Sequence, residues 1–188
     1  RTTNRHDLSL KPPRKTMLDL LKDAGRDVIA VGKIFDIFDG EGVTEKIKTT
    51  GNTNGIAFTK ALQTRDFEGL AFVNLVDFDM LYGHRRDVAG YAAAATEFDK
   101  FVADFIPGMR EGDILMVTAD HGCDPSYTKT TDHTREYVPY LICGKGVKPG
   151  VDLGTRLCFG TIAQTICDYL GVDASTLDGQ SVLSDILA

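Results

Sequence analysis

The chain has 188 residues, of which 43% are hydrophobic and 26% charged, and its formal net charge is −6. These values are ordinary for a folded globular protein, and they exclude a disordered or collagen-like chain. No apolar run approaches the ~20 residues of a membrane span, and an acidic chain without a basic stripe argues against nucleic-acid and membrane partners.

Four segments have the patterns of helices. The first is flanked by Thr16 and Asp19, which have the spacing of a capping box, and by Gly25, which suits a helix end. The third is alanine-rich, can be capped by Asp87 and is ended by a Pro-Gly pair. The helices are therefore expected over residues 17–24, 54–63, 88–106 and 161–170.

Four apolar runs between these helices have the composition of buried strands. They lie at residues 27–32, 70–76, 114–118 and 137–143. Alternating strands and helices predict an α/β fold with a mostly parallel sheet and helices on both faces. Strongly apolar strands fit this fold because parallel strands are buried on both sides. Ligands of such folds bind at the carboxyl ends of the strands.

Three of the four histidines lie beside carboxylates near predicted strand ends. Asp79 and His84 follow the second strand, Asp120 and His121 follow the third, and His133 precedes the fourth. Any one such histidine is more often a loop or core residue than a ligand, but the coincidence of three clusters favours a metal site. Asp120 and His121 are adjacent, so their side chains diverge and can reach two different ions. Mixed oxygen and nitrogen donors suit Mn²⁺ or Zn²⁺. Two ions ~4 Å apart are typical of phosphoryl-transfer sites.

Asp77 is a weaker alternative ligand in the same region. It lies two residues before Asp79, and both side chains would point the same way if the second strand continued through them.

These clusters resemble the alkaline phosphatase superfamily and, within it, the phosphopentomutase family. The Ala-Asp-His-Gly element alone indicates only the superfamily, whereas Asp-His-Thr-Arg-Glu and Gly-Lys-Ile-Phe-Asp-Ile-Phe point to the mutase family. The resemblance covers nearly the whole chain and rests on residues 4–7, 32–38, 74–79, 83–87, 118–125 and 131–139.

The resemblance implies the interconversion of ribose 1-phosphate and ribose 5-phosphate, and of the 2-deoxyribose pair. It also implies two Mn²⁺ ions, with Zn²⁺ or Mg²⁺ as alternatives, and a phosphorylated threonine. By position, Asp79, His84 and His133 match ligands of one ion, and Asp120 and His121 match ligands of the other.

Lys33 matches the residue that holds the distal phosphate of the pentose phosphate substrate. Without the resemblance, it reads as a solvated lysine at a strand end. A cofactor-independent phosphoglycerate mutase and a phosphate-ester hydrolase are alternatives with the same kind of metal site. A hydrolase would not need Lys33, because it does not have to hold a second phosphate while the sugar reorients. A non-catalytic metal-binding domain is a third interpretation.

The chain also departs from the family pattern. The family begins with a glycine-rich segment that carries a further metal-binding aspartate, followed by the threonine nucleophile, and neither element is found here. Residues 1–15 are therefore expected to return from a missing cap domain, and residues 16–188 to form the carboxyl-terminal part of the core domain. The catalytic threonine is expected in the missing amino-terminal part of the same polypeptide, so that this chain alone would be inactive.

The cysteine pattern indicates the compartment. The four cysteines contain no CxxC pair, and the chain opens without a signal-peptide pattern. Reduced thiols in a cytoplasmic protein are therefore expected.

Overall fold

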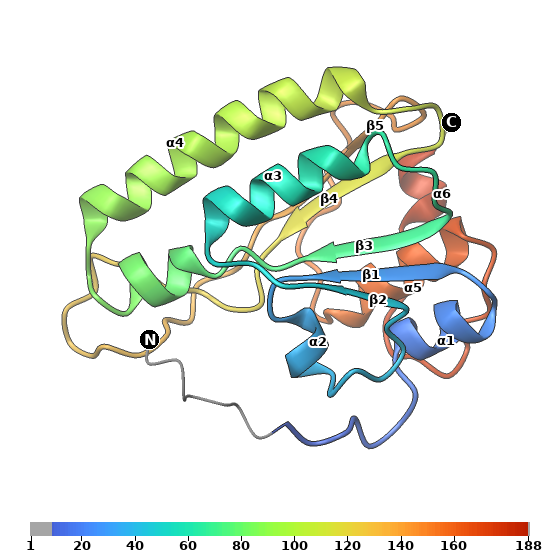
Figure 1. Cartoon of the computed structure of the whole chain (residues 1–188), viewed down its shortest axis with the longest axis horizontal. Helices are drawn as coiled ribbons and strands as arrows, with labels where there is room; N and C mark the ends of the chain where they lie inside the picture. Colours follow the sequence, from blue (N-terminus) through green and yellow to red (C-terminus); the bar gives the residue numbers. More distant parts are fainter. Residues whose placement is uncertain (1–8, 188) are drawn as a thin grey trace. The chain divides into compact units, whose positions relative to one another are not determined.

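Figure 1 shows the computed structural model of the protein, which describes residues 9–187. The chain divides into two compact units. The first contains residues 9–49 together with Asp66–Asn74 and Asp152–Ile186, and the second contains Thr50–Arg65, Leu75–Val151 and Leu187. The expectation for residues 1–15 falls largely on residues 1–8, which lie outside the described part of the chain.

The first unit contains a parallel three-stranded sheet. Its central strand is β1 (Asp27–Val31), which pairs with β2 (Glu45–Ile47) on one side and with β3 (Gly69–Val73) on the other. The last residue of β1 aligns with the last residues of β2 and β3, so the three carboxyl ends share one edge. β1 is buried on both faces, as expected of a central parallel strand.

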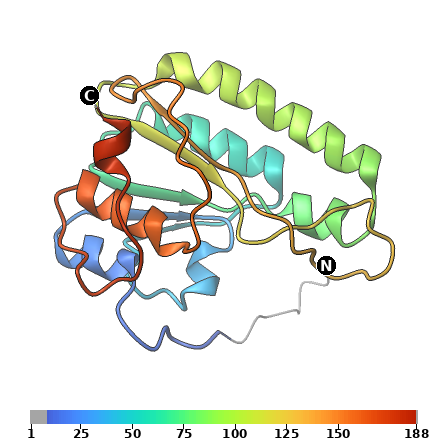
Figure 2. The same ribbon diagram turned by 180° about the vertical axis from the view of Figure 1, so that it is seen from behind.

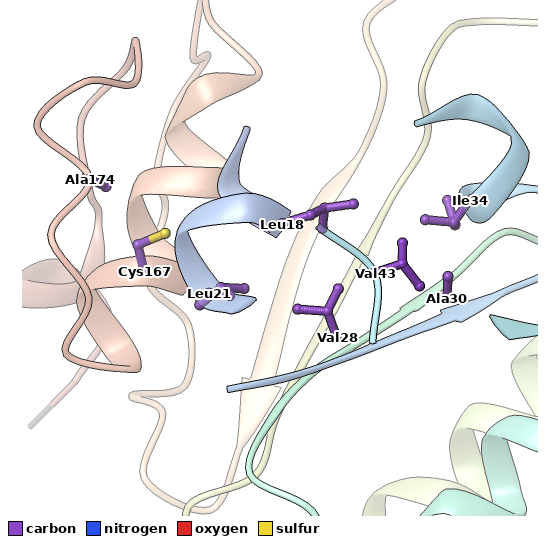
Figure 3. Packing of buried hydrophobic residues seen from close by; sticks show 8 residues of the cluster. All are labelled: Leu18, Leu21, Val28, Ala30, Ile34, Val43, Cys167 and Ala174. Atoms are coloured by element: carbon purple, nitrogen blue, oxygen red, sulfur yellow. The ribbon is translucent and has the colours of Figure 1, made fainter. Parts of the chain in front are cut away.

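Four helices belong to the first unit: α1 (Met17–Asp23), α2 (Ile34–Ile37), α5 (Gly160–Tyr169) and α6 (Leu183–Ile186). The capping box expected at the start of α1 is present. Figure 2 shows α5 and α6 in the foreground. Figure 3 shows the core of this unit, where side chains of α1, α2 and α5 pack on β1. Its buried members are Leu18, Leu21, Val28, Ala30, Ile34, Val43, Cys167 and Ala174.

The helical part of the second unit contains α3 (Asn52–Leu62), the π-helix η1 (Phe78–Gly83), α4 (Val88–Phe105) and the short 3₁₀-helix η2 (Ile106–Gly108). The side chain of Asp87 accepts a hydrogen bond from the backbone N–H of the third residue of α4, at 2.9 Å, and so forms the expected cap. α3 lies beside α4 in Figure 1.

The second unit also contains an antiparallel strand pair, β4 (Ile114–Thr118) and β5 (Tyr140–Gly144). An isolated bridge between Gly122 and Thr134 continues this pairing beyond the strands. Because the two strands run in opposite directions, the segment that precedes β5 lies at the carboxyl end of β4. This arrangement brings distant stretches of sequence to one place.

The α/β class is confirmed, with parallel pairing in the sheet of the first unit. All four expected strands and all four expected helices are present, although the last strand is antiparallel to its neighbour. The sequence patterns missed β2, α2, α6 and the two short helices η1 and η2. Within residues 9–187, no helix combines the length and apolar character that crossing a bilayer requires.

Candidate metal centre

Four of the five predicted ligands come together in the second unit, from three places in the sequence. Asp79 lies in the first turn of η1, and His84 follows the last residue of that helix. His121 lies just beyond β4 and His133 just before β5, so the antiparallel pairing brings them to the same end of the strand pair.

The carboxylate of Asp79 is the common neighbour of two imidazoles. Its Oδ1 atom lies 3.2 Å from Nε2 of His84 and 3.4 Å from Nε2 of His133. Ligand atoms of Asp79, His121 and His133 all lie within 4.8 Å of one another. The rings of His121 and His133 stack with centroids 3.5 Å apart and an interplanar angle of 19°. This spacing is that of donor atoms which could share one cation.

The hydrogen bonds of this cluster fit a cation. Asp79 Oδ1 is buried and no group within residues 9–187 donates a hydrogen bond to it. Nδ1 of His84 lies 2.6 Å from the carbonyl oxygen of Thr131, which can only accept, so Nδ1 carries a proton and donates it. The other nitrogen, Nε2, lies 3.2 Å from Asp79 Oδ1 without forming a hydrogen bond to it. A buried carboxylate oxygen without a hydrogen bond, beside imidazole nitrogens, is an environment that a metal ion stabilises.

His121 is held in the same tautomer as His84. Its Nδ1 lies 3.1 Å from the carbonyl oxygen of Gly122, which leaves the Nε2 lone pair free for a ligand. Asp120 Oδ2 lies 3.6 Å from His121 Nε2, but the Asp120 side chain is 74% exposed. Asp120 is therefore the most peripheral of the five predicted ligands.

Asp77 makes a structural contact. Its Oδ2 accepts a hydrogen bond from the backbone N–H of Asn52 at 2.7 Å, and its own N–H donates to the Asn52 side-chain oxygen at 2.9 Å. This reciprocal pair joins the first residue of α3 to the segment before η1. The strand ends at Val73 and a π-helix follows, so the two-residue spacing of a strand does not relate Asp77 to Asp79.

Cys123 is a neighbour of the site that the sequence patterns did not single out. Its side chain is buried, and burial, followed by the negative charge of Asp79, raises the pKa of the thiol. A Cβ atom at Gly83 would lie 2.5 Å from the Cys123 sulfur, so only glycine fits at this position without a shift of its neighbours. A buried thiol after an Ala-Asp-His-Gly element gives no sequence signal that separates it from an ordinary core cysteine.

Lys33 belongs to the first unit, between β1 and α2. Its carbonyl oxygen accepts the N–H of Ile37 at 2.9 Å, so it opens the short helix. The preceding Gly32 has a φ of 84°, and a Cβ there would lie 2.6 Å from the carbonyl oxygen of Asn74. Glycine is thus required where the chain turns out of the sheet, and Lys33 is the first side chain beyond this turn at the carboxyl edge.

Residues 1–174 match the family model described as the metalloenzyme superfamily. The chain belongs to the metalloenzyme superfamily. Membership implies a divalent metal, and the cluster of Asp79, His121 and His133 in the second unit could hold one.

Curated relatives carry a more specific name. A protein of Lachnoclostridium phytofermentans named phosphopentomutase is 54% identical over 187 residues, which cover 100% of this chain and 47% of that protein. Phosphopentomutases of Acetivibrio thermocellus and Desulfitobacterium hafniense are 52% and 49% identical over 187 residues, with 48% of each protein covered. The chain spans about half the length of the curated relatives it matches.

Proposed function

We propose that this chain carries the metal centre of a phosphopentomutase, which interconverts ribose 1-phosphate and ribose 5-phosphate and the corresponding 2-deoxyribose phosphates. The observation that carries the proposal is the buried Asp79 Oδ1, which lacks a hydrogen-bond donor and faces the Nε2 atoms of His84 and His133. Relatives of about 50% identity that bear the name phosphopentomutase support this choice over a phosphoglycerate mutase or a phosphate-ester hydrolase.

In this proposal, Asp79, His84 and His133 hold one divalent ion, and Asp120 and His121 hold the other. Ligand atoms of His121, Asp79 and His133 lie within 4.8 Å of one another, so the two ions of this proposal would adjoin, and His121 is also placed to reach the first ion. The ions are Mn²⁺, with Zn²⁺ as a substitute, because mixed nitrogen and oxygen donors suit both. Mg²⁺ is the third candidate and would rely on the carboxylate oxygens. When bound, such ions polarise phosphoryl oxygens and neutralise their charge.

The residues of the chain have their own tasks in this proposal. The carbonyl groups of Thr131 and Gly122 keep His84 and His121 in the tautomer that presents Nε2. Lys33 holds the phosphate remote from the metals, because its ammonium has no carboxylate partner among residues 9–187 and can form a charge-assisted bond with phosphate. The threonine that accepts the phosphoryl group lies in the amino-terminal part of the polypeptide, outside this chain.

The proposed setting is the cytoplasm, where a phosphopentomutase serves nucleoside catabolism. Reduced cysteines are consistent with this setting, since the four thiols are free.

Two substitutions in the complete polypeptide test the metal and phosphate roles separately. His121→Ala should lower the content of divalent metal, measured by elemental analysis, and abolish turnover of every phosphate ester. Lys33→Ala should keep the metal but lower kcat/KM for the pentose 5-phosphate about ten- to a hundredfold, because one charge-assisted contact is lost. Lys100→Ala, which replaces an exposed lysine on α4, is the control and should behave as the unmodified enzyme.

A small aryl phosphate separates the proposal from its alternatives. Lys33→Ala should leave hydrolysis of this ester unchanged, since it has no second phosphate. An equal loss on both substrates would place Lys33 in the fold or the metal centre. Full metal content and normal turnover in His121→Ala would refute the metal centre, and hydrolysis of pentose phosphates without isomerisation would favour a hydrolase.

A further inference from the structure

Arg86 lies two residues after His84, in the turn that follows η1. Its φ is 56°, in the left-handed region that residues other than glycine seldom adopt. The turn is closed by a hydrogen bond from the Arg86 N–H to the carbonyl oxygen of Gly83, at 3.0 Å, and by one from Asp87 to Tyr82, at 2.9 Å. An unusual backbone conformation at a charged residue suggests that its side chain is needed in one particular direction.

The Arg86 guanidinium directs all five of its N–H groups to backbone carbonyl oxygens. Nη1 donates to Gly83 at 3.1 Å and to Asp124 at 2.9 Å. Nε donates to Thr130 at 3.0 Å, and Nη2 donates to Thr130 and, at 2.6 Å, to Asp132. A guanidinium has only five N–H groups, so none remains for a phosphate oxygen.

The acceptors of these bonds surround the metal centre. Thr130 and Asp132 are the two neighbours of Thr131, whose carbonyl oxygen lies 2.6 Å from Nδ1 of His84. The side-chain Oδ1 of Asp132 accepts a hydrogen bond from the backbone N–H of His133, at 2.8 Å. The guanidinium thus holds the peptide groups on both sides of Thr131. These contacts fix the Thr131 carbonyl oxygen, which orients the imidazole of His84, and the backbone next to His133.

We infer that Arg86 is a positioning residue, which holds the 124–132 loop so that His84 and His133 face Asp79 before any ion binds. That Arg86 aids metal binding rests on the proposed function, whereas its ordering of the 124–132 loop does not. Lysine cannot replace this arginine, because an ammonium offers three donors at one point, whereas the guanidinium spreads five donors over a rigid plane.

The test compares Arg86→Lys and Arg86→Ala with Arg85→Ala in the complete polypeptide. Arg85 is the matched control, because it is adjacent, equally charged and exposed. Two quantities are measured: amide hydrogen exchange of residues 124–133 in the metal-free protein, and Mn²⁺ affinity by calorimetric titration. Arg86→Lys should exchange faster in this loop and bind Mn²⁺ about 10–100-fold more weakly, as is usual when support behind a metal ligand is lost. Arg85→Ala should change the affinity by less than about twofold.

Each outcome bears on the inference. Arg86→Lys with the exchange and Mn²⁺ affinity of the unmodified protein would overturn it. A rise in KM for the phosphate substrate with both quantities unchanged would also overturn it and make Arg86 a phosphate ligand. If the unmodified protein binds no Mn²⁺, the proposed function fails, and loop exchange in the metal-free Arg86→Lys variant alone decides whether Arg86 orders the loop. The lysine variant keeps the test valid where Arg86→Ala fails to fold.

Discussion

Replacing Asp79 by asparagine should raise the stability of the metal-free protein while removing its response to metal. Asp79 Oδ1 is buried without a donor among residues 9–187, and it faces the Nε2 atoms of His84 and His133 at 3.2 and 3.4 Å. A buried polar atom without a partner costs about 1–3 kcal/mol, and more when it is charged. Asparagine has the same shape, carries no charge and offers an N–H group to one imidazole nitrogen.

The expected gain for metal-free Asp79→Asn is about 1–2 kcal/mol, near the lower end of that range, because the Asp79 side chain is 33% exposed and its other oxygen keeps some solvation. In a complete polypeptide about twice the length of this chain, as its relatives are, such a gain raises the melting temperature by about 1–2 °C. Bound metal should reverse the order of the two melting temperatures, so that the unmodified protein melts above Asp79→Asn. The unmodified protein gains about 4 kcal/mol when Mn²⁺ exceeds its dissociation constant a thousandfold. The variant has lost a ligand and should gain little.

Thermal unfolding of the complete polypeptide measures both effects, once with EDTA and once with excess Mn²⁺. Both scans use the same buffer of about pH 8, so that the two proteins are compared at one pH. Asp99→Asn removes a charge from an exposed position of α4 and should leave both melting temperatures unchanged. The reasoning is refuted if Asp79→Asn melts below the unmodified protein in EDTA, or if Mn²⁺ raises both melting temperatures equally.

Three further predictions concern the surroundings of the site and the thiols. Asp77→Ala leaves the amide group at the start of α3 without its acceptor, and urea unfolding should show a loss of about 1–3 kcal/mol with Mn²⁺ affinity retained. Gly83→Ala should cost about 1–3 kcal/mol in the same assay, because the new methyl group overlaps the sulfur of Cys123, and adding Cys123→Ala should recover part of the loss. Mass spectrometry after alkylation at about pH 8 should find Cys158 labelled before Cys167. Cys158 is exposed, whereas burial raises the pKa of the Cys167 thiol and so lowers its thiolate fraction. Labelling of Cys167 should accelerate as the pH rises, and equal labelling rates of the two cysteines would contradict this prediction.

Elements with strong local signals were predictable from the sequence. The third strand was expected over 114–118, and β4 has these bounds. The long helix was expected to follow Asp87, which caps α4. Gly25 and Gly171 end their helices with φ values of 76° and 68°, in the left-handed region where glycine is favoured. In each case one residue type satisfies a local backbone requirement, so the sequence pattern and the structure agree.

Elements that depend on their partners were not predictable. β2 has the sequence Glu-Lys-Ile, which is too short and polar for a strand pattern, and it exists because it pairs with β1. The apolar run of β5 predicts a strand but carries no information about direction, which pairing with β4 decides. The π-helix η1 has no periodicity of its own, so the sequence gives no sign of it; the expected strand runs to Val76, whereas β3 ends at Val73.

In the candidate site, too, the local sequence marks some features, whereas others depend on groups that are distant in the sequence. Carboxylates and imidazoles near strand ends identified the ligand set, because these side chains have a recognisable chemistry. The carbonyl groups that take part in holding them could not be predicted: Arg86 donates to carbonyl oxygens of the 124–132 loop, and the Thr131 carbonyl oxygen orients His84. Every residue has a carbonyl group, so no residue type marks these acceptors. Only the three-dimensional path of the loop distinguishes them.

The segment Phe78–Arg86 concentrates the departures from regular structure near this site. It contains a π-helix, the buried and unpaired carboxylate oxygen of Asp79, and Arg86 in the left-handed region. Each of these features destabilises the chain taken alone, and such features accumulate where function requires a geometry that regular structure does not provide. Here they share one result, because the π-helix carries Asp79 and the turn after it sends His84 and Arg86 toward the 124–132 loop. A sequence chosen only for stability would replace Asp79 by a neutral residue, so the carboxylate is best explained by the cation that it is proposed to bind.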